Sequence, residues 1–148
     1  MSKRNTLAVA ATTAALLGGG LVFASPAEAA CFPNNWGATN TAGDIVGAYA
    51  HGQWCELSSG PTAGRIDVNV TLKDTDGDGR AACAQLHATY ADGGTRDEWV
   101  YNGKGAGEEA YAAYSFASSV RKIWVREGLG NGGTCTVMAS GVHTFYSA

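Results

Sequence analysis

The sequence predicts an all-β fold, a small antiparallel β-sandwich or barrel with two disulfides. Three observations favour this class. Short segments rich in β-branched and aromatic residues recur between Asp-Gly and Asn-Gly turn signals. Residues 66–73 alternate strictly between apolar and polar side chains, which is typical of a strand with one buried and one solvent-exposed face. The chain has four cysteines, an even number that is consistent with a disulfide-stabilised exported domain.

Residues 66–90 are predicted to form a central β-hairpin. Apolar residues occupy every second position of its first arm: Ile66, Val68, Val70 and Leu72. Apolar residues also share one face of the second arm: Ala82, Ala84, Leu86, Ala88 and Tyr90. Between the arms, residues 74–79 contain two Asp-Gly steps, which supply positive-φ positions. We therefore expect the two arms to pair side by side, joined by this bend.

The remaining strands are expected over shorter apolar segments. These are residues 45–50, 99–101, 135–139 and 142–146. The glycine-rich segment 128–133 is predicted to be a break between strands. Most of residues 31–61 shows no clear period, and we interpret it as loop.

Residues 108–127 allow two interpretations. Several apolar residues follow the i, i+3, i+4, i+7 spacing of an amphipathic helix, among them Ala113, Phe116 and Val120. Against a helix, residues 120–125 are rich in β-branched and aromatic side chains, which favour strands. We prefer two strands, at 111–117 and 120–126. The alternative is an α+β fold with a helix over 108–127 laid across the sheet.

The first 29 residues have the composition of a secretory signal peptide. Two basic residues precede an apolar stretch at 6–24, and residues 27–29 form a small-x-small cleavage site. We therefore expect residues 30–148 to be a single secreted β-domain of 119 residues, a length that suits one modest core. No later segment is apolar enough over 18 residues to predict a membrane anchor.

The charge of the expected mature chain disfavours two classes of partner. Without residues 1–29 the chain has eight basic and twelve acidic residues, a net charge of −4. A mildly acidic chain without a run of Lys or Arg is not expected to bind nucleic acid or anionic membranes. The expected partner is an extracellular carbohydrate or protein.

The cysteines are predicted to form two disulfides. All four lie after the expected cleavage site: Cys31, Cys55, Cys83 and Cys135. We prefer the pairs Cys31–Cys55 and Cys83–Cys135, because the first closes the N-terminal segment and the second ties the central hairpin to the C-terminal strand. No two cysteines are spaced as a CxxC zinc knuckle, so a metal role is disfavoured.

The acidic bend is a candidate calcium site. Its pattern Asp74-x-Asp76-x-Asp78-Gly resembles the start of the calcium loop of EF-hands and dockerins, which implies that these three aspartates are ligands. The resemblance covers about seven residues. The acidic residue expected at position 12 of such a loop is Gln85 here. The other interpretation is a bend in which the aspartates accept hydrogen bonds from nearby backbone amides.

A second candidate site lies in the segment 120–126. If Ile123 and Val125 point inward, then Lys122, Trp124 and Arg126 share the outer face of the strand. A tryptophan between two cations is a candidate platform for a sugar ring or a peptide. The other interpretations are that the Lys and Arg stems cover an exposed tryptophan, or that Val120 and Trp124 form the inward face instead.

Catalysis has weaker support in the sequence. No GxSxG, HExxH or catalytic-cysteine pattern is present. Three histidines, His51, His87 and His143, come from separate segments. A ribonuclease-type constellation would combine His87 or His143 with Glu98 and Arg121. We therefore favour a protein without enzyme activity over a small secreted hydrolase.

The sequence thus favours a secreted, disulfide-stabilised binding or structural module that acts outside the cell, with calcium as a candidate ligand. The alternatives are a small secreted hydrolase such as a ribonuclease, or a protease inhibitor. In length, export and cysteine count the chain is similar to subtilisin-inhibitor-type proteins. No reactive loop corresponds, so that similarity assigns a role to no residue.

Overall fold

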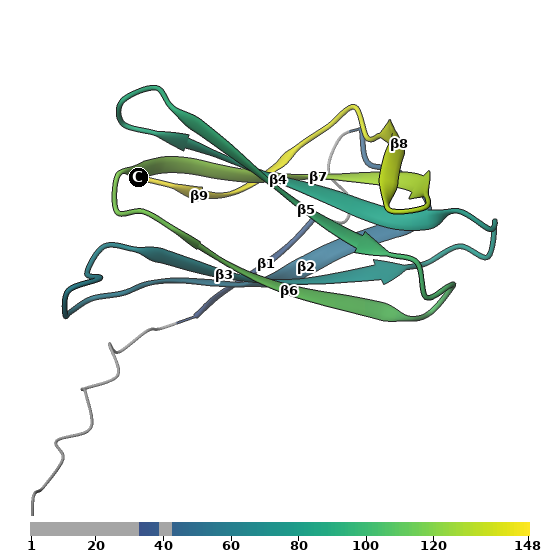
Figure 1. Cartoon of the computed structure of the whole chain (residues 1–148), viewed down its shortest axis with the longest axis horizontal. Helices are drawn as coiled ribbons and strands as arrows, with labels where there is room; N and C mark the ends of the chain where they lie inside the picture. Colours follow the sequence, from purple (N-terminus) through teal and green to yellow (C-terminus); the bar gives the residue numbers. More distant parts are fainter. Residues whose placement is uncertain (1–32, 39–42) are drawn as a thin grey trace, which may run out of the picture.

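The computed structural model describes residues 33–38 and 43–148, which form two packed antiparallel sheets (Figure 1). Sheet A has the strand order β1-β2-β3-β6, and sheet B has the order β5-β4-β7-β8, with β9 also paired to β7. The predicted β-sandwich is therefore confirmed. The strands are β1 (Asn34–Gly37), β2 (Ala48–Glu56), β3 (Ile66–Asp74), β4 (Ala81–Tyr90), β5 (Thr95–Asn102), β6 (Glu109–Phe116), β7 (Val120–Asn131), β8 (Thr134–Met138) and β9 (His143–Ser147).

The segment that allowed a helix consists of two strands, β6 and β7, and the described residues contain no helix. Within β6 the residues that pair opposite the buried positions of β3 are Ala110, Ala112, Tyr114 and Phe116. They recur with period two, as in a strand, and Ala113 of the helical spacing is exposed on the other side of β6. The β-branched content of 120–125 indicated the correct alternative.

The core lies between the sheets and follows the predicted alternation. In β3 the residues Ile66, Val68, Val70 and Leu72 are at most 1 % exposed. In β4 the residues Ala82, Ala84, Leu86 and Ala88 are fully buried. The predicted inward faces of both segments are confirmed, and each faces the opposite sheet.

The predicted pairing of these two segments is wrong. β3 pairs with β2 and β6 in sheet A, whereas β4 pairs with β5 and β7 in sheet B. The acidic bend therefore crosses from one sheet to the other instead of closing a hairpin (Figure 1). Of its two Asp-Gly steps, only Gly79 has a positive φ, at 78°. Alternation shows which face of a strand is buried, but strands on opposite sides of a core alternate in the same way as neighbours.

Several predicted strand limits also change. The strand expected at 45–50 begins only at Ala48 and continues to Glu56, within the region interpreted as loop. The strand expected at 120–126 extends to Asn131, through part of the predicted glycine break. Glycine serves close packing there, because a Cβ on Gly130 would lie 1.8 Å from the carbonyl oxygen of Thr134 on β8. The turn itself contains Gly132 and Gly133, both with positive φ.

The two lateral edges of the sandwich, where sheet A meets sheet B, are closed by different kinds of contact. Between β1–β2 and β9, Trp36 stacks on Phe145 at 4.6 Å, and Trp54 meets Tyr146 edge-on at 5.1 Å. Between β5 and β6 the closure is polar. The Tyr114 hydroxyl donates a hydrogen bond to the carbonyl of Trp99, and Arg96 donates one to the carbonyl of Ser115.

The predicted Cys83–Cys135 disulfide is present and links β4 to β8. Cys55 is also disulfide-bonded, and its predicted partner, Cys31, lies outside the described residues, as does the predicted signal peptide. Among the described residues, no helix is long and apolar enough to cross a membrane.

Candidate binding face

The outer surface of sheet B gathers aromatic and polar side chains from three adjacent strands. Because alternate residues of β4, β5 and β7 fill the core, the residues between them face outward. We call this surface the aromatic face. It consists of Gln85 and His87 from β4, Asp97, Trp99 and Tyr101 from β5, and Lys122, Trp124 and Arg126 from β7.

Trp124 lies at the centre of a stacked cluster. Its cross-strand neighbour His87 stacks on the indole with a centroid distance of 4.6 Å and an interplanar angle of 18°. The Nδ1–H of His87 donates a hydrogen bond of 2.7 Å to Asp97 on β5. The Arg126 guanidinium also lies over the indole, 5.7 Å from the ring centroid. Cross-strand pairs and cation–π contacts of this kind hold the rings in fixed orientations.

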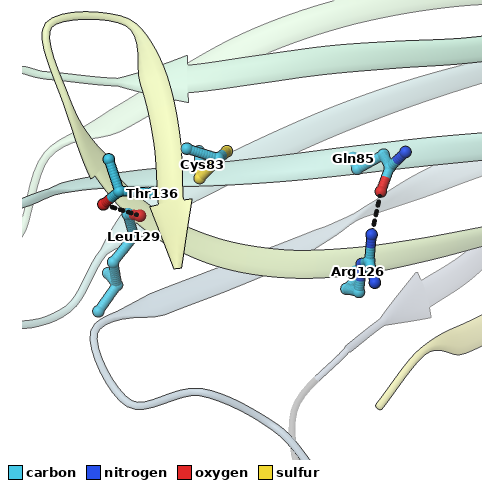
Figure 2. The surroundings of a disulfide bond; sticks show 6 residues. Cys83, Gln85, Arg126, Leu129 and Thr136 are labelled. Atoms are coloured by element: carbon cyan, nitrogen blue, oxygen red, sulfur yellow. Dashed lines mark hydrogen bonds between the residues drawn. A yellow bond between two sulfur atoms is a disulfide. The ribbon is translucent and has the colours of Figure 1, made fainter. Parts of the chain in front are cut away.

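The next row across the sheet is Trp99, Gln85 and Arg126, which are register partners on β5, β4 and β7. Arg126 donates a hydrogen bond of 2.8 Å to the side-chain oxygen of Gln85 (Figure 2). Gln85 is 8 % exposed, and Arg126 is partly exposed. This row thus places a hydrogen-bonded polar pair next to Trp99 in the sheet.

Trp99 and Tyr101 form the most exposed aromatic pair of the aromatic face. Each is 38 % exposed. Their rings are nearly parallel, with an interplanar angle of 14° and centroids 6.4 Å apart. Both residues were predicted to lie in a strand, but neither was predicted to belong to a site. The aromatic residues at positions i and i+2, on either side of the apolar Val100, were the signal for this outward pair.

The structure places Lys122, Trp124 and Arg126 on the same outer face, because Ile123 and Val125 are fully buried. Trp124 and Arg126 touch, while Lys122 is exposed at the next row of the sheet. The contacts of Trp124 with His87 and Arg126 cover the indole rather than leaving its face open. The ligand-binding role of the three residues stays a prediction.

The acidic bend distributes its aspartates among different partners. Asp78 forms a salt bridge with Arg80 and accepts a hydrogen bond from the Arg80 amide, and these contacts lower the pKa of Asp78. Asp74 is 2 % exposed and accepts a hydrogen bond from the Asp76 amide at 3.2 Å. Among the described residues no three His, Cys, Asp or Glu side chains are arranged to hold a metal ion. Calcium binding by the bend stays a prediction.

The residues proposed for a ribonuclease-type site do not meet. His87 faces outward and bonds to Asp97. Glu98 pairs in register with the buried Leu86, so it lies on the inner side of β5, where it forms a salt bridge with Arg96. His143 is on β9, and β4 and β7 separate β9 from β5 in the sheet. His87 and Glu98 thus lie on opposite sides of sheet B, and His143 is separated from Glu98 by two strands.

The disulfide anchors one end of the aromatic face. It joins Cys83 on β4 to Cys135 on β8 (Figure 2). The register partner of Cys83 on the intervening strand is Gly128. A Cβ on Gly128 would lie 2.9 Å from the sulfur of Cys83 and 2.7 Å from the carbonyl oxygen of Val137. The glycine therefore gives the disulfide its space.

One buried acid was not identified from the sequence. Glu127 on β7 is 2 % exposed and points into the core, where it accepts a hydrogen bond from the amide of Ala50 on β2. Burial, together with a side-chain hydrogen bond to Asp44, raises the pKa of Glu127 to about 8. The sequence signal for Glu127 was its position two residues after Val125, where a carboxyl group follows the inward-facing apolar residues of β7.

These features define a two-sheet antiparallel β-sandwich with an aromatic surface on one sheet. Comparison with protein-family models, with curated protein sequences and with solved structures found no match to the chain.

Proposed function

We propose that the protein is a secreted binding module and that the aromatic face binds an extracellular carbohydrate. The observation that carries this proposal is the nearly parallel, partly exposed pair of Trp99 and Tyr101, with Trp99 in the same register row as the hydrogen-bonded Gln85 and Arg126. Sugar rings offer apolar C–H surfaces for stacking on aromatic rings and hydroxyl groups for hydrogen bonds. The face presents both kinds of contact within three adjacent strands.

The order of the face also supports binding. The backbone of Trp99 is held by the hydrogen bond from Tyr114 of the opposite sheet. Arg126 is held by Gln85 and by the indole of Trp124. Side chains that are ordered before binding lose less conformational freedom when a ligand arrives. In this arrangement Trp124 and His87 support the face, while Trp99 and Tyr101 contact the sugar.

The charge on the face agrees with a polar, uncharged ligand. It combines cationic Lys122 and Arg126 with anionic Asp97, which is paired to His87. A surface of mixed charge steers neither a polyanion nor a polycation strongly. Hydroxyl groups, in contrast, can accept from the cations and donate to the carboxylate.

The test is binding of the purified protein to insoluble chitin, cellulose and xylan, followed by tryptophan fluorescence titration with their soluble hexasaccharides. We expect at least one polysaccharide to remove the protein from solution. We expect Trp99→Ala to lower the affinity for the corresponding hexasaccharide at least tenfold. The matched control is Tyr111→Ala, which removes an aromatic residue that is 72 % exposed on sheet A.

Two results would overturn the proposal. One is that no polysaccharide in the set is bound by the folded protein. The other is that Trp99→Ala and Tyr111→Ala bind as the unchanged protein does, which would remove the aromatic face from the interaction.

A further inference from the structure

A partly open cavity of about 420 Å³ lies at one end of the sandwich. Three connections meet there: β3 to β4, β5 to β6, and β7 to β8 (Figure 1). Its volume is within the range of small-molecule binding pockets, which is about 300–1,000 Å³. We call it the end cavity.

Glycines keep the end cavity open. Five of its lining residues are glycines: Gly77, Gly79, Gly103, Gly105 and Gly132. A Cβ built on four of them meets no atom within 4 Å, and on Gly77 it would come only to 4.0 Å from Ala106. The loops therefore do not pack against one another across the end cavity. Without side chains at these glycines, backbone groups are accessible along the cavity walls.

Polar side chains line the cavity beside the glycines. Asp74 and Asp76 come from the acidic bend, Arg80 from the position just before β4, and Asn131 from the end of β7. Asp74 is almost fully buried, and its amide and carbonyl bond to the β5–β6 connection, so the wall is fixed. Carboxylates and a carboxamide accept hydrogen bonds, and the carboxamide also donates, which suits a ligand with several hydroxyl groups.

The cavity continues the line of exposed aromatic rings. Trp99 and Tyr101 are alternate outward residues of β5. Gly103, two positions after Tyr101, lines the end cavity. A ligand chain that runs along β5 over the two rings would therefore reach the cavity at the end of the strand.

We propose that the end cavity holds the terminal unit of the saccharide chain whose following units stack on Tyr101 and Trp99. This inference rests on the proposed carbohydrate binding and adds recognition of the chain end. The open face of sheet B accepts any part of a chain, whereas the end cavity, where three connections meet, has room for the end of a chain. A terminal unit also has one more free hydroxyl than an internal unit, which the Asp76 and Asn131 side chains can bind.

The experiment uses the hexasaccharide that binds in the fluorescence titration above, and a soluble polymer of the same sugar with known chain length. We expect a stoichiometry of one protein per chain for both probes. We expect Gly103→Leu and Gly77→Leu to lower affinity for the hexasaccharide at least tenfold by filling the cavity. Neither glycine has a positive φ, so both variants are compatible with the backbone. Asp76→Asn changes the wall without adding volume and is expected to weaken binding less.

The outcomes separate the two proposals. If the polymer binds several proteins per chain, and both leucine variants keep full affinity while Trp99→Ala loses it, the chain-end inference is overturned and the binding face stands. If one protein binds each chain and both leucine variants lose affinity with an unchanged melting temperature, the inference holds. If no variant loses binding, Trp99→Ala included, both proposals are overturned.

Discussion

The carboxyl group of Glu127 on β7 accepts a hydrogen bond from the backbone amide of Ala50 on β2, so one buried side chain links the two sheets. The carbonyl of Ala50 accepts from Ala38, just after β1. The carbonyl of Glu127 accepts from Ala139, just after β8. The contact thus joins the middle of both sheets to the segments that flank them.

Glu127 makes the stability of the protein depend on pH. The folded protein holds the Glu127 proton up to about pH 8, whereas the unfolded chain releases it near 4.5. The contribution of this group is therefore fully present below about pH 4.5 and is lost as the pH rises to about 8. Because one pKa unit corresponds to about 1.4 kcal/mol, the decline is on the order of a few kcal/mol.

Urea unfolding at a series of pH values checks this prediction. Glu127→Gln keeps an oxygen for the Ala50 amide but does not titrate, so its free energy of unfolding should exceed that of the unchanged protein near pH 8.5. Glu108→Gln, at an exposed position, is the control. The same pH dependence in the Glu127→Gln variant would contradict the assignment.

Gly128→Ala should destabilise the fold by about 1–3 kcal/mol or more, as overpacking of a filled site does. The new Cβ would lie 2.6 Å from the Met138 sulfur and 2.7 Å from the backbone oxygen of Val137. Gly103→Ala is the matched control, because its Cβ meets no atom within 4 Å. Thermal unfolding of both variants measures the difference, and equal melting temperatures would refute the packing described around the disulfide.

Val70→Asp and Asn69→Asp test which face of β3 is buried. Val70 is 1 % exposed, while its neighbour Asn69 is exposed on the outer side of sheet A. A carboxylate at position 70 has no partner in the core, so we expect a loss of several kcal/mol there and little at position 69. Chemical denaturation of the two variants gives the comparison, and similar midpoints would argue against this orientation of the strand.

The calcium prediction for the acidic bend is tested by thermal melts in EDTA and in millimolar calcium. If Asp74, Asp76 and Asp78 bind the ion, calcium raises the melting temperature, since a ligand at 100 times its Kd adds about 2.7 kcal/mol. Asp76→Asn should abolish the rise. Identical melts in the two solutions would leave the bend with the hydrogen-bonding role described above.

The sequence was sufficient for the parts of the fold that depend on local alternation. Ile66 to Leu72 and Ala82 to Ala88 were assigned to the correct inward faces because period two is a property of each strand alone. The pairing of these strands was wrong because it depends on which neighbours fill each sheet, and β6 and β7 come much later in the chain. Local pattern contains no information about such partners.

The candidate site was predictable to a similar extent. The sequence allowed either Ile123 and Val125 or Val120 and Trp124 as the inward face, and the burial of Ile123 and Val125 shows that Trp124 and Arg126 point outward. The contact of Trp124 with His87 did not follow, because it depends on the register between β4 and β7. The exposure of Trp99 could not be predicted either, since an aromatic residue in a short strand is compatible with the buried or the exposed face.

The crossing of the acidic bend between the sheets has a consequence for how the chain reaches its native state. β3 has its partner at β6, with Ile66 opposite Phe116, and β4 has its partner at β7, with Ala81 opposite Gly130. Neither sheet can be completed until the polypeptide is present well past residue 110. Proteins dominated by such distant pairings fold in about milliseconds to seconds, far more slowly than helical bundles. The chain therefore acquires its native shape only after its last third, which contains β6 and β7, is present.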